Sequence, residues 1–192
     1  KSMQKTKEKG HRPGRPVNEQ LQLERRSAIL SASTRVFAKQ GFAETDVQEI
    51  ADLVGVGKGT IYRYFPGKDV LFLSAVDFAM RQLTEAVNRA AASAEHPLDR
   101  IAAGVRAYLS FFNEHPEAAE LLIHERAHFR DRMTPTYFVH REANMAPWRA
   151  LIQDLIRQGV IRDVPVERVV NAISNLVYGT MFTNYFSGSN SP

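Results

Sequence analysis

The stretch TDVQEIADLVGVGKGTIYRYFPGKDVL, residues 45–71, contains the strongest local signals in this chain of 192 residues. Asp46 and Glu49 have the spacing of a capping box, in which each side chain satisfies a backbone donor of a helix's first turn. Gly55 follows a short apolar face, where a left-handed residue turns the chain out of a helix. A second short helix then buries Ile61. Two short helices joined by a glycine turn predict a helix-turn-helix motif, and an ordinary packed helical hairpin is the alternative.

The second helix of this motif presents small and basic residues opposite its buried face. A small first turn lets the backbone lie deep in the major groove of DNA while Lys58 and Thr60 reach base edges. Further donors toward the phosphate backbone come from the aromatic and basic residues that follow, which are Tyr62, Arg63, Tyr64 and Lys68. This surface favours binding to double-stranded DNA.

The positive charge of the chain is concentrated toward its start. Residues 1–68 hold 13 Lys and Arg against 7 Asp and Glu, whereas residues 69–192 hold 12 against 14. A basic head on a slightly acidic body is expected where only the head faces a polyanion. The charge distribution therefore agrees with the motif.

Residues 1–17 form a basic arm interrupted by Pro and Gly, and their scarcity of apolar side chains predicts disorder. The RPGRP run at residues 12–16 resembles the core of an AT-hook, whose arginines enter a narrow A·T minor groove. We therefore expect Arg12 and Arg15 to contact DNA. A merely solubilising tail is one alternative, and an architectural A·T-binding protein that relies on this arm is another.

Beyond the arm, apolar residues recur at helical spacing without sustained strand-like alternation. We predict an all-α protein with three parts: an N-terminal three-helix helix-turn-helix domain over residues 18–67, a helical ligand-binding and dimerisation domain over 68–188, and a tail over 189–192. Expected helices in the second domain include one over 136–158 and another over 165–186. The last helix is apolar around much of its circumference, which suggests a second subunit as its partner.

The middle and last helices carry bulky aromatic residues, which by default form an ordinary core. Pockets between helices are also built from such residues together with a few polar groups. The candidate pocket residues are Phe78, Phe112, His124, His128, Trp148, Asn175 and Tyr178, and Asn144 is a further candidate among the polar groups.

The run HERAH at residues 124–128 matches the zincin pattern, in which two histidines four apart bind one zinc and the glutamate acts as a base. The sequence has no third-ligand continuation and no sheet to line a cleft. We therefore expect no bound metal, no cofactor and no enzymatic activity. A small metal-dependent hydrolase using His124, Glu125 and His128 is the alternative from a different class.

The segment from Phe37 to Leu71 resembles the DNA-binding domain of the TetR family of bacterial repressors. Gly57 departs from the family pattern, which usually has Ser or Thr as this helix cap, and Asp46 replaces a hydroxyl residue. The matching elements are Gly41-Phe42, Thr45, Ile50-Ala51, Gly55-Val56, Lys58-Gly59-Thr60-Ile61-Tyr62, Tyr64-Phe65 and Lys68.

This resemblance implies a homodimer whose last two helices form a four-helix interface, with a pocket for a small-molecule effector in the middle helices. It implies a repressor that leaves its DNA operator when the effector binds. Thr45, Tyr64 and Lys68 would contact phosphates. The residues lying in the groove would be Lys58, Gly59, Thr60 and Tyr62.

Composition excludes several other classes of protein. The chain contains no cysteine, which removes disulfides and thiolate nucleophiles and fits a reducing compartment. No apolar run approaches the ~20 residues that a membrane-spanning helix needs. We therefore expect a cytoplasmic protein without a membrane partner.

Overall fold

The computed structural model describes residues 19–188, and this part of the chain contains helices and no strand. The all-α prediction is confirmed. The arm with Arg12 and Arg15, and the tail over 189–192, lie outside the described residues. No helix in the described part is long and apolar enough to cross a lipid bilayer. The helices are α1 (Glu19–Glu44), α2 (Val47–Val54), α3 (Lys58–Tyr64), α4 (Lys68–Ala92), α5 (Pro97–Glu114), α6 (Pro116–His128), α7 (Thr136–Ala143), α8 (Ala146–Arg157) and α9 (Val166–Ser187).

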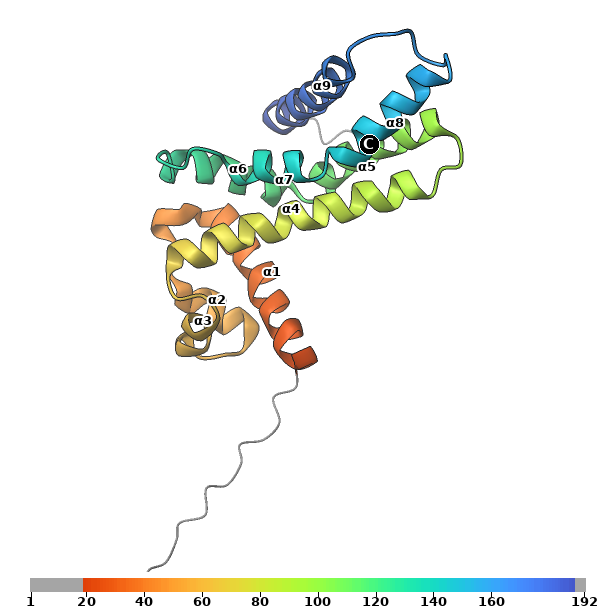
Figure 1. Cartoon of the computed structure of the whole chain (residues 1–192). Coiled ribbons are helices and arrows are strands. Elements are labelled where there is room, and N and C mark those ends of the chain that lie inside the picture. Colours follow the sequence, from red (N-terminus) through yellow and green to blue (C-terminus); the bar gives the residue numbers. More distant parts are fainter. Residues whose placement is uncertain (1–18, 189–192) are drawn as a thin grey trace, which may run out of the picture.

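The helices α1, α2 and α3 pack into a small head at one end of the molecule (Figure 1). Phe37, Ile50, Ile61 and Phe65 are each at most 1% exposed and form its core. Ile61 and Phe65 are four residues apart, so both project from the same side of α3 and its end. The predicted buried face of the motif is therefore confirmed.

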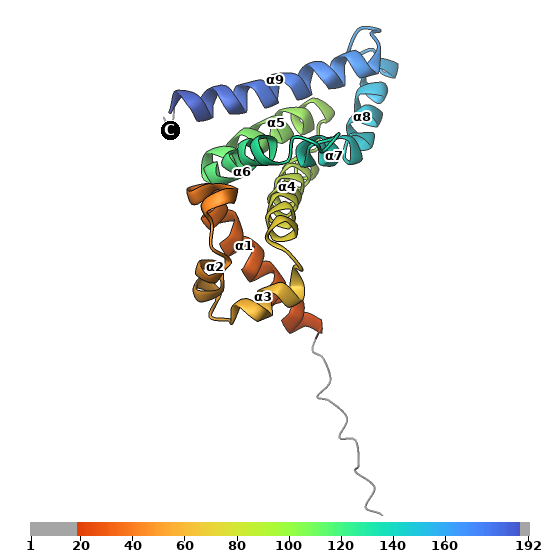
Figure 2. The ribbon, with the colours of Figure 1, turned by 90° about the vertical axis from the view of Figure 1, so that its left-hand side faces the viewer.

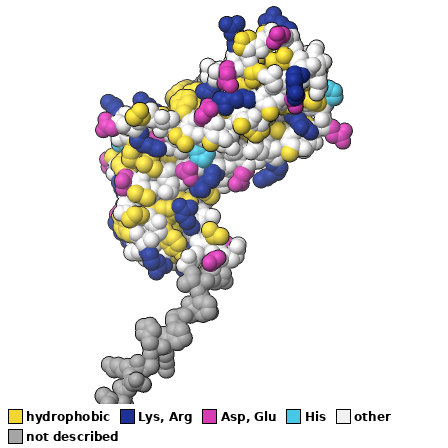
Figure 3. Space-filling model, viewed as in Figure 1, with side chains coloured by type: hydrophobic (Ala, Val, Ile, Leu, Met, Phe, Trp, Pro, Cys, Tyr) yellow, Lys and Arg dark blue, Asp and Glu magenta, His cyan; other side chains and the backbone are white. Residues whose placement is uncertain are grey.

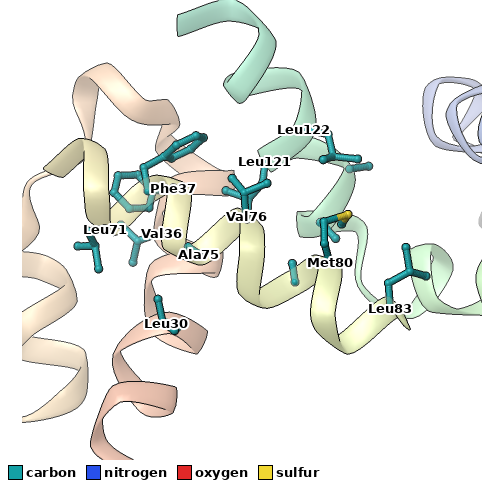
Figure 4. Packing of buried hydrophobic residues seen from close by; sticks show 14 of the residues in the cluster. Leu30, Val36, Phe37, Leu71, Ala75, Val76, Met80, Leu83, Leu121 and Leu122 are labelled. Carbon is teal, nitrogen blue, oxygen red and sulfur yellow. The ribbon is translucent and has the colours of Figure 1, made fainter. Parts of the chain in front are cut away.

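The long helix α4 joins the head to the body. It packs against α1 in the head and against α5, α6 and α7 in the body. Figure 4 shows its buried side chains in sequence, with Leu71 and Ala75 beside α1 and Met80 and Leu83 farther along the helix. These residues belong to one continuous hydrophobic core. Because packed interiors transmit displacement, a tilt of α4 in the body moves its end in the head.

The body is layered, with α9 across the end that lies farthest from α2 and α3 (Figures 1 and 2). α5 lies between α4 and α9 and contacts both. A smaller core of Ile152, Leu155 and Val170 joins α8 to α9. On the face seen in Figure 3, acidic and basic side chains are interspersed over the body.

Residues 136–158 form two helices, so the prediction of one continuous helix is wrong. α7 ends at Ala143, and Pro147 lies in the first turn of α8. A proline ring clashes with the carbonyl four residues earlier, which here is that of Ala143, and it offers no N–H donor. The interruption therefore falls where Pro147 ends the preceding helix.

Candidate nucleic-acid interface and ligand pocket

Both ends of α2 have the caps that the sequence predicts. Asp46 is the N-cap of α2, and its Oδ1 accepts a hydrogen bond from the backbone N of Gln48 at 2.9 Å. Gly55 is left-handed, with φ 69° and ψ 37°, and ends α2. Glu49 does not form its half of the predicted capping box, because its carboxylate accepts from Gln40 of α1 and so ties α2 to α1. The turn therefore holds α3 at a defined angle to the rest of the head.

The outer face of α3 is open to solvent. Gly59, Tyr62 and Arg63 are exposed, and Lys58, Thr60, and Tyr64 are half-buried. A methyl group added at Gly59 would meet no atom within 4 Å. Tyr62 is 40% exposed, whereas Ile61 beside it is fully buried. The helix thus presents its small first turn and an aromatic ring outward, as predicted.

Lys58 is held by an acidic neighbour in the head. Its Nζ lies 2.7 Å from Oδ1 of Asp46, the same oxygen that caps α2. The backbone N–H of Gln48, and after it Lys58, hold the pKa of Asp46 below its ordinary value. The same ion pair raises the pKa of Lys58. Both side chains remain accessible, so Lys58 can exchange this carboxylate for another partner.

Thr45 follows the last residue of α1, and the side chain of Lys68, the first residue of α4, reaches the same place. Thr45 is 3% exposed, and its Oγ1 donates to the carbonyl of Gly41 at 2.6 Å. The unbound head therefore does not present this hydroxyl for the phosphate contact expected from the family pattern. Nζ of Lys68 donates to the carbonyl of Ala43 at 2.8 Å and lies over the ring of Phe42. Lys68 is half-buried, so its side chain remains partly accessible to solvent.

The zincin-like run has a structural role. Glu125 is 1% exposed, and its Oε1 accepts from Nη1 of Arg132 and from the backbone N and Oγ1 of Thr136, the first residue of α7. His124 packs on Gly41 of α1 instead of facing a cleft. Residues 19–188 contain no group of three or more potential ligands placed to hold a metal. The hydrolase alternative is not supported, because its proposed base is enclosed between helices.

A cavity lies among α4, α5, α7, α8 and α9, and measures about 900 Å³ with its open mouth. Of the seven predicted pocket residues, Trp148 lines it. Its indole lies over Gly104 of α5, and a methyl group added there would come within 2.6 Å of the ring. The absence of a side chain at Gly104 therefore makes room for Trp148.

The other six predicted pocket residues lie elsewhere. Phe112 is buried in the main core, and Phe78 and Tyr178 pack against that core. His124 and His128 are on α6 beside Gly41 and Phe42, and Asn175 is exposed on α9. Helical periodicity places each of them on a helix but does not say which neighbour that helix will meet. Asn144, the further polar candidate, lines the cavity. The polar lining residues that sequence analysis missed are Thr84, Asn88, Tyr108, Tyr137, His140, Arg141 and Ser174.

Two family models match the chain, one over each part of this architecture. Residues 29–75 match the model of bacterial regulatory proteins of the tetR family, and residues 94–181 match the tetracyclin repressor-like C-terminal domain. The chain belongs to the TetR family.

Curated relatives match parts of this TetR-family chain. YerO of Bacillus subtilis, an uncharacterized HTH-type transcriptional regulator, is 46% identical over 55 residues, which are 29% of this chain and 19% of YerO. The HTH-type transcriptional regulator EthR of Mycolicibacterium smegmatis is 30% identical over 112 residues, 58% of this chain and 50% of EthR. The matches thus span half or less of these relatives' own length.

Solved structures of two regulators share the arrangement of helices over most of this chain. FadR from Bacillus subtilis, solved in complex with stearoyl-CoA, superposes with a TM-score of 0.69 at 19% identity, over 85% of this chain and 89% of that one. FadR from Bacillus halodurans gives a TM-score of 0.74 at 15% identity, over 88% and 87%. At these identities the likeness establishes the arrangement of helices.

Proposed function

We propose that this chain is a sequence-specific DNA-binding transcriptional regulator of the bacterial cytoplasm, a repressor without enzymatic activity that a small-molecule ligand releases from its operator. The observation that carries the proposal is the outer face of α3, where Gly59 is exposed and unobstructed and Tyr62 is exposed, held on a fully buried apolar core. Such a helix can enter a major groove with Gly59 against the DNA and with Thr60 and Tyr62 beside base edges. The DNA backbone phosphates then face Arg63, Tyr64 and Lys68.

The proposed release mechanism uses α4 as the connection between pocket and head. Met80, Leu83 and Thr84 of this helix line the pocket, while Leu71 packs in the head. Two recognition helices of a dimer fit successive major grooves only when they are about 34–36 Å apart. A ligand that favours a different tilt of α4 therefore lowers operator affinity by its differential binding free energy, typically about 1–3 kcal/mol.

Gly59→Ala tests the DNA-binding surface directly. The added methyl group meets no atom of the protein, and alanine is favoured over glycine in a helix by about 1 kcal/mol, so the melting temperature should stay equal or rise. The same methyl group should keep the backbone away from the groove floor and weaken operator binding by about tenfold or more, as for the loss of a good base contact. The operator is first located by footprinting on the DNA that flanks the gene.

The matched control is Ser110→Ala, a change at an exposed position of α5 in the body. It should leave both the melting temperature and operator affinity unchanged. Equal operator affinity for the wild type and for Gly59→Ala would contradict the placement of α3 in the groove. A wild-type protein that binds no duplex even at low salt would contradict the proposed function itself.

A further inference from the structure

Arg141 of α7 brings a positive charge to the wall of the pocket. Its Nη2 donates to Oδ1 of Asn171 at 2.7 Å, whereas its Nε is buried without a hydrogen-bond partner. Within residues 19–188 no carboxylate forms an ion pair with this guanidinium. A buried charged donor that lacks an acceptor is unfavourable. An acceptor carried by a ligand would remove this penalty.

A pair of tyrosines in the same wall supplies a second donor. Tyr108 Oη donates to Tyr137 Oη at 3.1 Å, and both residues line the pocket. Burial raises the pKa of both hydroxyls, and the nearby charge of Arg141 opposes that rise without reversing it. Both hydroxyls therefore stay protonated at neutral pH. Only one of their two protons lies between them, so the other is available to an acceptor in the pocket.

The rest of the lining favours an apolar molecule and offers nothing that repels an anion. Apolar side chains of α4, α5, α8 and α9 form most of the wall, and no Asp or Glu is among the lining residues. The acidic Asp77, which lies behind the wall, binds His140 at 2.7 Å and Arg81 at 2.8 Å. Its negative charge is thus already paired with the guanidinium of Arg81.

We propose that the pocket takes a carboxylate-bearing amphipathic molecule, with its carboxylate on Arg141 Nε and the free tyrosine proton and its apolar part against Trp148 and the aliphatic wall. The inference rests on the proposed function, because it names the class of ligand that would act on this regulator. A carboxylate is acceptor-only and satisfies two donors at once. An alcohol of the same length fills the same apolar space without charge.

The experiment compares octanoate, octan-1-ol and octylammonium, which share an apolar tail and differ in head-group charge. Trp148 is the single tryptophan of the chain and lines the pocket, so its fluorescence reports binding to the full-length protein without DNA. Octanoate should bind about tenfold or more tightly than octan-1-ol, as expected for a hydrogen-bonded charge. Octylammonium should bind most weakly of the three.

Arg141→Gln should reduce the preference for octanoate over octan-1-ol to about threefold or less, while leaving octan-1-ol affinity nearly unchanged. Arg106→Gln is the matched control, because Arg106 is exposed on α5 and does not line the pocket. It should behave as the wild type. Arg141→Lys, which keeps the charge but removes Nε, serves as a second variant and should lose part of the preference if the contact is specific.

Equal binding of octanoate and octan-1-ol to the wild type would overturn the inference and leave the proposed function standing. Absence of binding by all three compounds would also overturn it. Both outcomes are measured on the wild type, so neither depends on whether a variant folds. Failure of the proposed function shows separately, as the absence of duplex binding by the ligand-free protein. The two failures are therefore distinguishable in one set of purified samples.

Discussion

At the scale of single residues, Asp46 combines two tasks on the side of the head that we propose faces DNA. Its Oδ1 caps α2 and also binds Lys58, the first residue of α3. Binding of Lys58 to DNA requires it to exchange a carboxylate for a phosphate or a base edge. At the proposed interface a negative charge at this place would also repel phosphates, so we expect Asp46 to oppose binding to random DNA and to increase the weight of specific contacts.

Asp46→Asn isolates the effect of this charge, because asparagine caps a helix about as well as aspartate does. The variant should bind random duplex more tightly at low salt. The slope of log affinity against log salt should become steeper by about one unit, as for one additional phosphate contact. Fluorescence anisotropy over a salt series measures both quantities. Asp99→Asn, an exposed change at the start of α5, should have neither effect, and weaker binding by Asp46→Asn would contradict the repulsive role.

The same variant has an expected pH signature. The pKa of Asp46 lies below its ordinary value of 3.8, so its favourable contacts contribute stability above that pH and lose it as the pH falls through the lowered pKa. Asp46→Asn should therefore be slightly less sensitive to acid below about pH 4.

At the scale of elements, the connection from α6 to α7 depends on one buried carboxylate. Glu125 of α6 accepts from Arg132 in the connecting segment and from the backbone N and hydroxyl of Thr136 at the start of α7. These bonds satisfy an N-terminal amide of α7 whose N-cap, Pro135, offers no side-chain acceptor. Because α7 carries His140 and Arg141, Glu125 also positions part of the pocket wall.

Glu125→Ala should reduce the free energy of unfolding by about 3 kcal/mol, because it leaves the donors of Thr136 and Arg132 without their buried acceptor. Denaturation by urea, followed by circular dichroism, measures the change. Glu114→Ala at the exposed end of α5 is the control and should remain within about 0.5 kcal/mol of the wild type. A similarly small change for Glu125→Ala would show that the hydrogen bonds to Glu125 contribute little to the free energy of unfolding.

At the scale of the whole molecule, α9 presents an outward stripe that the single chain leaves uncovered. Leu176 and Phe186 are each 69% exposed, and Ala172, Gly179 and Thr183 lie on the same side of the helix. Small and apolar residues at this spacing suit close packing against a second copy of α9. A homodimer through the last two helices, α8 and α9, would place one head on each side of its two-fold axis.

Leu176→Glu should raise the dissociation constant of the homodimer by about 30-fold or more, the effect of a central interface residue, and should weaken operator binding with it. Sedimentation velocity over a concentration series measures the association. Leu98→Glu is the matched control, because Leu98 is 44% exposed on α5, away from the stripe. A dimer that survives Leu176→Glu but is lost in Leu98→Glu would place the interface elsewhere.

The helix boundaries and the exposed face of α3 could be predicted from the sequence alone, because they depend on chemistry between near neighbours in the chain. Asp46, Gly55 and Pro165 mark helix boundaries through hydrogen bonds and backbone angles that involve only near neighbours. The exposed face of α3 also follows from helical period, because Ile61 and Phe65 must share the buried side. The resemblance of residues 37–71 to the TetR pattern depends on the same local features.

Tertiary structure alone decided the pocket and the fate of several polar side chains. Whether a residue such as Trp148 or Asn175 lines a cavity depends on which helices, distant in sequence, pack beside its own. The zincin-like spacing at residues 124–128 is the same whether its glutamate faces a metal or, as here, the start of α7. Arg141 became a candidate ligand contact only when folding buried its Nε without an acceptor, because burial is a property of the packed helices and not of the local sequence.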